Sequence, residues 1–167
     1  MPSSPDSPFD IPDDLKRSGD TRWVTRVEWT QNVQARRTAA QSINDITETV
    51  VAWDAEDYDT STLHDNAVNN TRLTAIINGR YWVYAFARWA DGIGTKRTTK
   101  IRLNGATILT LSIIPPVVGD RTAWEVGVGV YLAVGDYVEA LVYQDSGGNL
   151  NLEGGATESY FGMFRTG

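Results

Sequence analysis

The side chains best suited to chemistry lie in one short stretch, residues 54–65. It contains the only histidine of the chain, His64, and four carboxylates that come shortly before it: Asp54, Glu56, Asp57 and Asp59. Calcium prefers oxygen ligands on a flexible loop, which such a run supplies. No glycine stands inside the run to make the sharp turn of a dedicated calcium loop. The sequence therefore favours a solvated acidic loop over 54–65, with a calcium site as the weaker alternative.

The same residues make poor catalytic machinery. A Ser-His-Asp triad would have to use His64, and no serine stands in the sequence of a nucleophile elbow. The chain has no cysteine, which excludes disulfides, thiolate metal sites and a cysteine nucleophile. We therefore expect no enzymatic activity, no cofactor and no dedicated metal site.

Charge and hydropathy argue against two kinds of partner. Fifteen Lys and Arg oppose 21 Asp and Glu, a net charge of −6, whereas a nucleic-acid binder shows a basic patch. No apolar run approaches the length of a transmembrane helix, and the first residues lack the charged and apolar regions of a signal peptide. One basic run is interpreted as the solvated edge of a hairpin: Lys96, Arg97, Lys100 and Arg102. We expect neither nucleic acid nor membrane as a partner.

The elements that position these residues fall into two parts, residues 1–30 and 31–167. Four of the six prolines stand at positions 2, 5, 8 and 12. Such a stretch buries too little apolar surface to offset the entropy of ordering it, so we expect an extended arm. A tail without a partner is one interpretation, and an arm held by a partner is the other. The candidate anchors are its large apolar residues: Phe9, Ile11, Leu15, Trp23 and Trp29.

From Thr21 onward the sequence pattern is almost entirely β, beginning with an alternating, half-buried strand at 23–29. Short apolar runs alternate with turn signals such as Asn104-Gly105, which predicts an all-β, antiparallel sandwich or jelly roll. Residues 31–44 are ambiguous, since helix propensity competes there with strand alternation. The predicted strands cover 47–53, 73–77, 81–89, 100–103, 107–114, 124–132, 137–144 and 159–165.

Three of these strands, 81–89, 124–132 and 159–165, are unusual. One face of each is apolar, and the opposite face carries mainly aromatic residues or glycines. The outer face of an antiparallel sheet in a monomer is normally polar, and glycines inside a strand indicate that another group approaches closely. The residues on the second face are Trp82, Tyr84, Phe86, Gly127, Gly129, Tyr131, Tyr160 and Phe164. Three exposed aromatic side chains in one strand exceed the few hundred Å² of apolar patch that monomers tolerate. The pattern predicts self-association, unless a loop or residues 21–30 cover this face within one chain.

Several short segments occur in a recognisable order between residues 39 and 167. They are Thr-Val-Val-Ala-Trp-Asp at 49–54, Asn-Gly-Arg-Tyr at 78–81, Arg-Leu-Asn-Gly at 102–105, the Gly-Asp turn within 132–138, Tyr-Gln-Asp-Ser-Gly-Gly at 143–148, and Ser-Tyr-Phe-Gly-Met-Phe at 159–164. In this order they resemble the jelly-roll family of tumour necrosis factor and the globular head of complement-q. The resemblance implies a ten-stranded jelly roll that assembles as a threefold trimer around its inner, aromatic sheet. It assigns Trp82, Tyr84, Phe86, Tyr131, Tyr160 and Phe164 to the trimer interface.

The chain departs from the animal members of that family, which carry collagen stalks, membrane anchors or signal peptides. A free-standing domain with a short acidic arm resembles the trimeric knobs and decoration proteins of bacterial viruses. The sequence therefore leads us to expect a structural protein of a virus particle, anchored to the capsid or tail by residues 1–30 and located on the surface of the virion. The alternative is an adhesion module that binds a receptor or glycan through loops 91–99 and 145–156.

Overall fold

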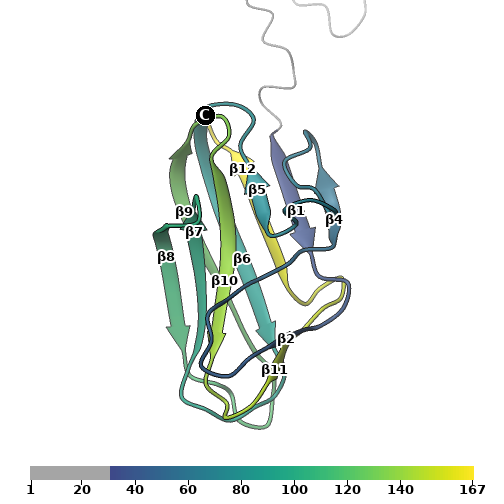
Figure 1. Cartoon of the computed structure of the whole chain (residues 1–167), viewed down its shortest axis with the longest axis vertical. Coiled ribbons are helices and arrows are strands. Elements are labelled where there is room, and N and C mark those ends of the chain that lie inside the picture. Colours follow the sequence, from purple (N-terminus) through teal and green to yellow (C-terminus); the bar gives the residue numbers. More distant parts are fainter. Residues whose placement is uncertain (1–30) are drawn as a thin grey trace, which may run out of the picture.

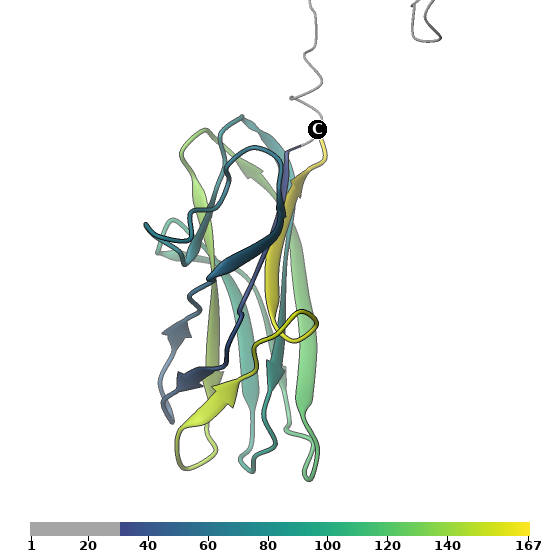
Figure 2. The ribbon, with the colours of Figure 1, turned by 90° about the vertical axis from the view of Figure 1, so that its right-hand side faces the viewer.

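Two antiparallel β-sheets, packed face to face, make up the part of the chain that the structure describes, residues 31–167 (Figure 1). The structure is a computed structural model, and its two layers are seen in the turned view of Figure 2. The expected all-β sandwich is confirmed. Within residues 31–167, no helix has the length and apolar character needed to cross a bilayer.

The strands divide unequally between the sheets. The seven-stranded sheet contains β1 (Asn32–Arg36), β2 (Gln41–Ile43), β4 (Ala55–Asp59), β6 (Gly79–Trp89), β9 (Thr122–Leu132), β11 (Leu150–Leu152) and β12 (Tyr160–Arg165). The five-stranded sheet contains β3 (Thr49–Val50), β5 (Arg72–Thr74), β7 (Arg97–Leu103), β8 (Thr107–Ile114) and β10 (Tyr137–Gln144).

The long strand β6 organises the seven-stranded sheet. It pairs with β9 on one side and with β12 on the other, and β1 and then β4 continue beyond β12. The short strands β11 and β2 lie beside the end of β6 at Trp89. In the five-stranded sheet, β10 and β7 are central and β8 forms an edge.

The core lies between the sheets and follows from the two-residue period of the strands. In β6, the side chains of Tyr81, Val83 and Ala85 point inward and are buried. Trp53 lies against Phe161 of β12 with their ring centroids 5.8 Å apart, and both side chains are fully buried. Because every second residue of β6 and β12 fills this core, the residues between them must face outward.

The strand count and several boundaries differ from the sequence predictions. Residues 31–167 contain twelve strands rather than ten, because pairing produces short strands such as β2 and β11 that carry no signal of their own. The ambiguous residues 31–44 form β1 and β2, since hydrogen bonding to β12 and β11 overrides helix propensity. The predicted acidic loop over 54–65 was wrong in its first half, which is the edge strand β4.

The basic run is not the solvated hairpin edge that the sequence predicted. Its strand, β7, lies between β10 and β8, so its side chains meet neighbours on both sides. Lys100 pairs with Glu48, and Arg102 pairs with Glu139 at 2.8 Å. Arg97 is 1% exposed and donates to the carbonyl oxygens of Gly92, Ile93 and Lys96. The charges of Arg97, Lys100 and Arg102 therefore serve the fold.

Candidate assembly interface

The outward residues of the seven-stranded sheet lie in register across its strands. One row consists of Asn32, Phe164, Trp82 and Gly129, taken from β1, β12, β6 and β9. The next row adds β4 and consists of Tyr58, Gln34, Gly162, Tyr84 and Gly127. The third consists of Arg36, Tyr160, Phe86 and Glu125. We call the outward residues of β6, β9 and β12, from Arg80 to Phe86, Glu125 to Tyr131 and Tyr160 to Phe164, the aromatic face.

All eight residues expected at an interface belong to this one face. Tyr131 is 63% exposed, Phe164 43% and Trp82 41%, while Tyr84 and Phe86 are half-buried. The ring of Phe86 stacks on that of Tyr160 at a centroid distance of 5.0 Å. The structure therefore brings the predicted residues together, and Trp82, Tyr131 and Phe164 remain exposed among residues 31–167.

Gly162 is the residue that allows the central row to form. A Cβ atom at this position would lie 2.3 Å from the Cζ and hydroxyl oxygen of Tyr84, so any side chain here would collide with that ring. The Tyr84 side chain crosses β12 through this gap and donates to Gln34 Oε1 of β1 at 2.9 Å. Because the Tyr84 hydroxyl already donates to Gln34, the 3.1 Å contact between the two tyrosine hydroxyls must be donated by Tyr58.

The hydrogen bonds of Tyr84, Gln34 and Tyr58 continue into charged groups at the edge of the seven-stranded sheet. Gln34 Nε2 donates to Asp57 at 2.8 Å, and the second oxygen of that carboxylate accepts from Arg36 Nε at 2.7 Å. Burial raises the pKa of the Tyr84 phenol. Burial also raises the pKa of Tyr160, whose hydroxyl donates to Glu125 at 3.2 Å. Both phenols therefore stay neutral and act as hydrogen-bond donors near pH 7.

Gly127 makes room for a second aromatic ring. A Cβ atom on it would lie 2.8 Å from Cζ2 of the Trp82 indole, whereas one on Gly129 would make only an ordinary contact at 3.9 Å. The expectation that glycines in β9 mark a close approach therefore holds for Gly127. The Trp82 indole therefore lies over Gly127 of β9 and remains 41% exposed.

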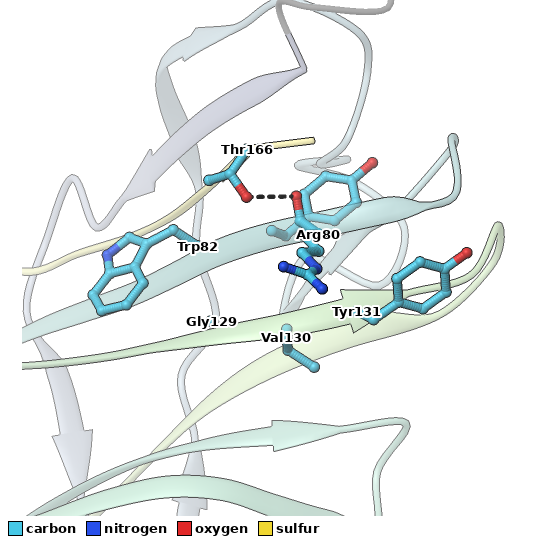
Figure 3. A pocket seen from close by; sticks show the side chains of 7 residues that line it. Arg80, Trp82, Gly129, Val130, Tyr131 and Thr166 are labelled. Carbon is cyan, nitrogen blue, oxygen red and sulfur yellow. Dashed lines mark hydrogen bonds between the residues drawn. The ribbon is translucent and has the colours of Figure 1, made fainter.

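A shallow depression of about 320 Å³ lies at one end of the aromatic face. Figure 3 shows Trp82 and Tyr131 on either side of the Arg80 guanidinium, with Gly129 and Val130 below. The hydroxyl of Thr166 donates a hydrogen bond to the Arg80 carbonyl oxygen at 3.2 Å. The Arg80 side chain has no ion-pair partner among residues 31–167, so the depression offers an apolar surface with one positive charge.

Gly162→Ala is expected to lower the free energy of unfolding by about 1–3 kcal/mol, the usual cost of forcing extra volume into a packed site. The Tyr84 ring must swing away and lose its hydrogen bond to Gln34. Chemical denaturation followed by tryptophan fluorescence measures the change. The control is Gly148→Ala, because a Cβ atom at Gly148 meets nothing within 4 Å. Equal stability of the two variants would contradict the packing described here.

The acidic stretch does not form a metal centre in the described residues. No group of three or more His, Asp or Glu side chains gathers there in a way that could hold a metal ion, within residues 31–167. The carboxylates have protein partners instead. Asp54 accepts from Thr38, Asp57 from Arg36, and Asp59 from the Ser61 and His64 amides.

The only histidine is similarly occupied. His64 is buried, with Nδ1 2.7 Å from Glu56 Oε1 and Nε2 3.1 Å from the Asn70 carbonyl oxygen. It joins β4 to the loop before β5, and its ring is enclosed by these partners. No serine among residues 31–167 is bonded to it, so this part of the chain does not provide a nucleophile–base pair with His64.

Two further sets of residues are expected at other sites. The anchors Phe9, Ile11, Leu15, Trp23 and Trp29 lie outside the described residues. The loops expected to bind a glycan are tied to each other, because Asp145 accepts hydrogen bonds from the amides of Thr95 and Lys96. The end of the first predicted loop, 91–99, belongs to β7, and the middle of the second, 145–156, belongs to β11.

Sequence reasoning missed three contributors to the face: Gly162, Tyr58 and Gln34. Gly162 could have been found, since it is the only position without a side chain between the outward residues Tyr160 and Phe164. Tyr58 and Gln34 could not, because their strands were not predicted. Their place in the row depends on pairing between β1 and β4.

The two sheets, their strand order and the outward aromatic face define an antiparallel jelly-roll sandwich. More particularly, the fold is that of the tumour necrosis factor and complement-q heads. Eiger TNF from S. frugiperda superposes with a TM-score of 0.61 at 10% identity, covering 83% of this chain and 93% of that chain. Murine APRIL at pH 5.0 gives 0.64 at 12% identity, covering 82% of this chain and 99% of its own. The globular domain of zebrafish complement 1qA gives 0.58 at 12% identity, covering 82% and 98%.

Sequence comparison adds no closer relationship, because no protein-family model and no curated protein matches the chain. At these identities the structural likeness establishes the fold alone. Function has to be argued from the surface of this chain.

Proposed function

We propose that this protein is a non-enzymatic structural protein of a virus particle. It assembles as a homotrimer through the aromatic face and is attached to the capsid or tail surface by residues 1–30. The observation that carries the proposal is the exposed aromatic face itself. Trp82, Tyr131 and Phe164 present apolar area on a sheet surface that is normally polar in a monomer.

The chemistry of the face suits association between copies. Aromatic side chains dominate interface energetics, and the phenols of Tyr84 and Tyr160 have their hydrogen bonds satisfied within the protomer. The face can therefore be covered without leaving these polar atoms unpaired. The threefold geometry is what the family resemblance of the sequence implies.

Attachment is assigned to the arm because of its composition. Residues 1–30 contain apolar anchors between prolines and aspartates and would be costly to order without a partner. A trimer presents three such arms, so weak binding by each of them becomes strong attachment through avidity. The surface of the particle is the location that this arrangement suits, with the jelly roll displayed outward.

The proposal is tested by comparing tagged full-length chain with chain lacking residues 1–20 during infection. We expect full-length protein in gradient-purified particles and at least a hundredfold less of the truncated protein, because avidity is lost with all three arms. A length-matched control, Phe9→Ser/Ile11→Ser/Leu15→Ser, should behave like the truncation. Truncated protein that still reaches particles would show that the arm is not the attachment segment.

A second candidate function, adhesion to a receptor or glycan, is favoured by the depression beside Arg80. Exposed aromatic rings such as Trp82 and Tyr131 can stack on a sugar, and an unpaired guanidinium can bind its carboxylate. Binding of the full-length chain to an array of acidic and neutral glycans separates the two candidates. Binding that is abolished by Arg80→Ala would support adhesion.

A further inference from the structure

A second apolar surface lies on the other side of the sandwich. The outer face of the five-stranded sheet carries the exposed side chains of Leu111 and Ile113 on β8, with Ile46 beside them. This face is separate from the aromatic face, which belongs to the seven-stranded sheet. A threefold assembly through the aromatic face therefore does not by itself account for these residues.

These side chains line a groove of about 420 Å³, which we call the outer groove. Its apolar walls are Ile46, Leu111, Ile113 and the ring of Tyr143. Its polar rim consists of Glu48, Lys96, Thr98 and Lys100, so two ammonium groups stand against one carboxylate. The groove is thus apolar inside and carries a net positive charge at its margin.

The charge at the rim is only partly compensated. Lys100 is paired with Glu48. The Lys96 ammonium group lies 4.9 Å from the centroid of the Tyr143 ring and has no carboxylate partner among residues 31–167. An occupant with apolar side chains and a nearby carboxylate would complement the groove.

The chain contains such a segment outside the described residues. Residues 5–15 read Pro-Asp-Ser-Pro-Phe-Asp-Ile-Pro-Asp-Asp-Leu, with Phe9, Ile11 and Leu15 interleaved with aspartates. The prolines at 5, 8 and 12 favour an extended backbone, which loses little entropy on docking into a groove. This is the segment that the proposed function uses for attachment.

The segment is long enough to reach the groove of its own protomer. Gln31 is at the C-terminal end of β12, where its carbonyl oxygen accepts from the Arg165 amide. About 20 residues separate Gln31 from Ile11, and they span roughly 65–70 Å when extended or roughly 25 Å as a flexible chain. The longest strand is 11 residues, or about 36 Å. The extended tether therefore exceeds the length of the sandwich, and docking within one protomer does not depend on protein concentration.

We infer that residues 5–15 occupy the outer groove of their own protomer while the protein is unattached. Phe9, Ile11 and Leu15 then cover Leu111 and Ile113, and an aspartate meets Lys96. This inference rests on the proposed function. Docking on the particle then competes with the outer groove for residues 5–15, so the apolar anchors are not left exposed before attachment.

The absence of cysteine makes the contact directly testable. In full-length Ile11→Cys/Ile113→Cys, mild oxidation is expected to form a disulfide within one chain, which keeps the protomer mass on a non-reducing denaturing gel. The matched control is Ile11→Cys/Val134→Cys, because Val134 is 61% exposed and Ile113 is 59% exposed. We expect oxidation of the first pair to be at least tenfold faster.

Equal rates for the two pairs would overturn the inference, and so would a disulfide mainly between chains. Lys96→Glu should slow the first pair severalfold at low salt and leave the control pair unchanged. Particles are not needed for this measurement, so its failure is distinct from failure of the attachment proposal.

A second measurement avoids any change to the groove. Hydrogen exchange of β8 and of the Tyr143 region is compared between the wild-type chain and Phe9→Ser/Ile11→Ser/Leu15→Ser. The three substitutions lie outside the described sandwich, and we expect severalfold faster exchange only around the groove. Identical exchange in both proteins would overturn the inference.

Discussion

Trp82→Glu is expected to reduce the solution mass of the protein from about three times 18.4 kDa to 18.4 kDa, measured by light scattering on the full-length chain. Trp82 lies over Gly127 on the aromatic face and is 41% exposed in the protomer. Burying a large apolar side chain contributes about 1.5–3 kcal/mol, so three copies lose about 5–9 kcal/mol per trimer. A buried, unpaired carboxylate adds a further penalty.

The matched control for this prediction is Ile113→Glu, which places the same charge on the opposite sheet. Ile113 also lies on a strand and is more exposed than Trp82, so both substitutions should leave the protomer folded. We expect the control to remain trimeric. A wild-type mass of one protomer would show that the aromatic face is not an interface between copies, and the proposed assembly would then be wrong.

Asp145→Asn is expected to lower the free energy of unfolding by about 3 kcal/mol at pH 7, because it leaves Arg97 charged, 1% exposed and unpaired. For a chain of this size that corresponds to a fall of about 6–12 °C in melting temperature. The carboxylate itself is 16% exposed, so the larger part of the cost comes from the buried guanidinium. Calorimetry measures the difference.

The effect has a characteristic pH dependence. Desolvation works to raise the pKa of Asp145, but hydrogen bonds from the Thr95 hydroxyl and the Lys96 and Thr95 amides outweigh it. Together with the Arg97 charge, they lower this pKa from 3.8 to about 2. Because the folded-state pKa is the lower one, the stabilisation is complete above pH 4 and is lost as the pH falls towards 2. The gap between wild type and Asp145→Asn should therefore close over that interval.

The control for the acid dependence is Glu153→Gln, since no hydrogen bond to the Glu153 side chain occurs within residues 31–167. We expect its stability to follow that of the wild type at every pH. If the gap for Asp145→Asn stays constant from pH 4 to pH 2, the role assigned to this carboxylate is wrong.

The aromatic face could be predicted because it depends on local alternation. In β6 and β12 each outward residue follows directly from the strand period, and the structure confirms the parity of Trp82, Tyr84, Phe86, Tyr160 and Phe164. The two-sheet fold followed from the same patterns together with turn signals. Neither inference required knowledge of distant contacts.

Other features depend on contacts between distant parts of the chain and could not be predicted from the sequence. β4 looks like a loop because Asp and Glu disfavour strands, yet Arg36 and His64 lie within hydrogen-bond distance of its carboxylates in the folded edge strand. Arg97 looks solvated, yet Asp145, far along the chain, allows it to be buried. In both cases a tertiary contact overrides a local preference, which is for a loop in β4 and for solvent at Arg97.

The place of β12 has a consequence for the timing of biosynthesis. β12 is made after the other strands of the sandwich, yet it lies between β1 and β6 and pairs with both. Until it emerges from the ribosome, β1 has no neighbour on that side and the sheet remains divided. Nascent chains on one messenger RNA therefore cannot associate through a finished surface during most of translation. The many long-range pairings also favour folding in milliseconds to seconds, so the proposed self-association would follow late.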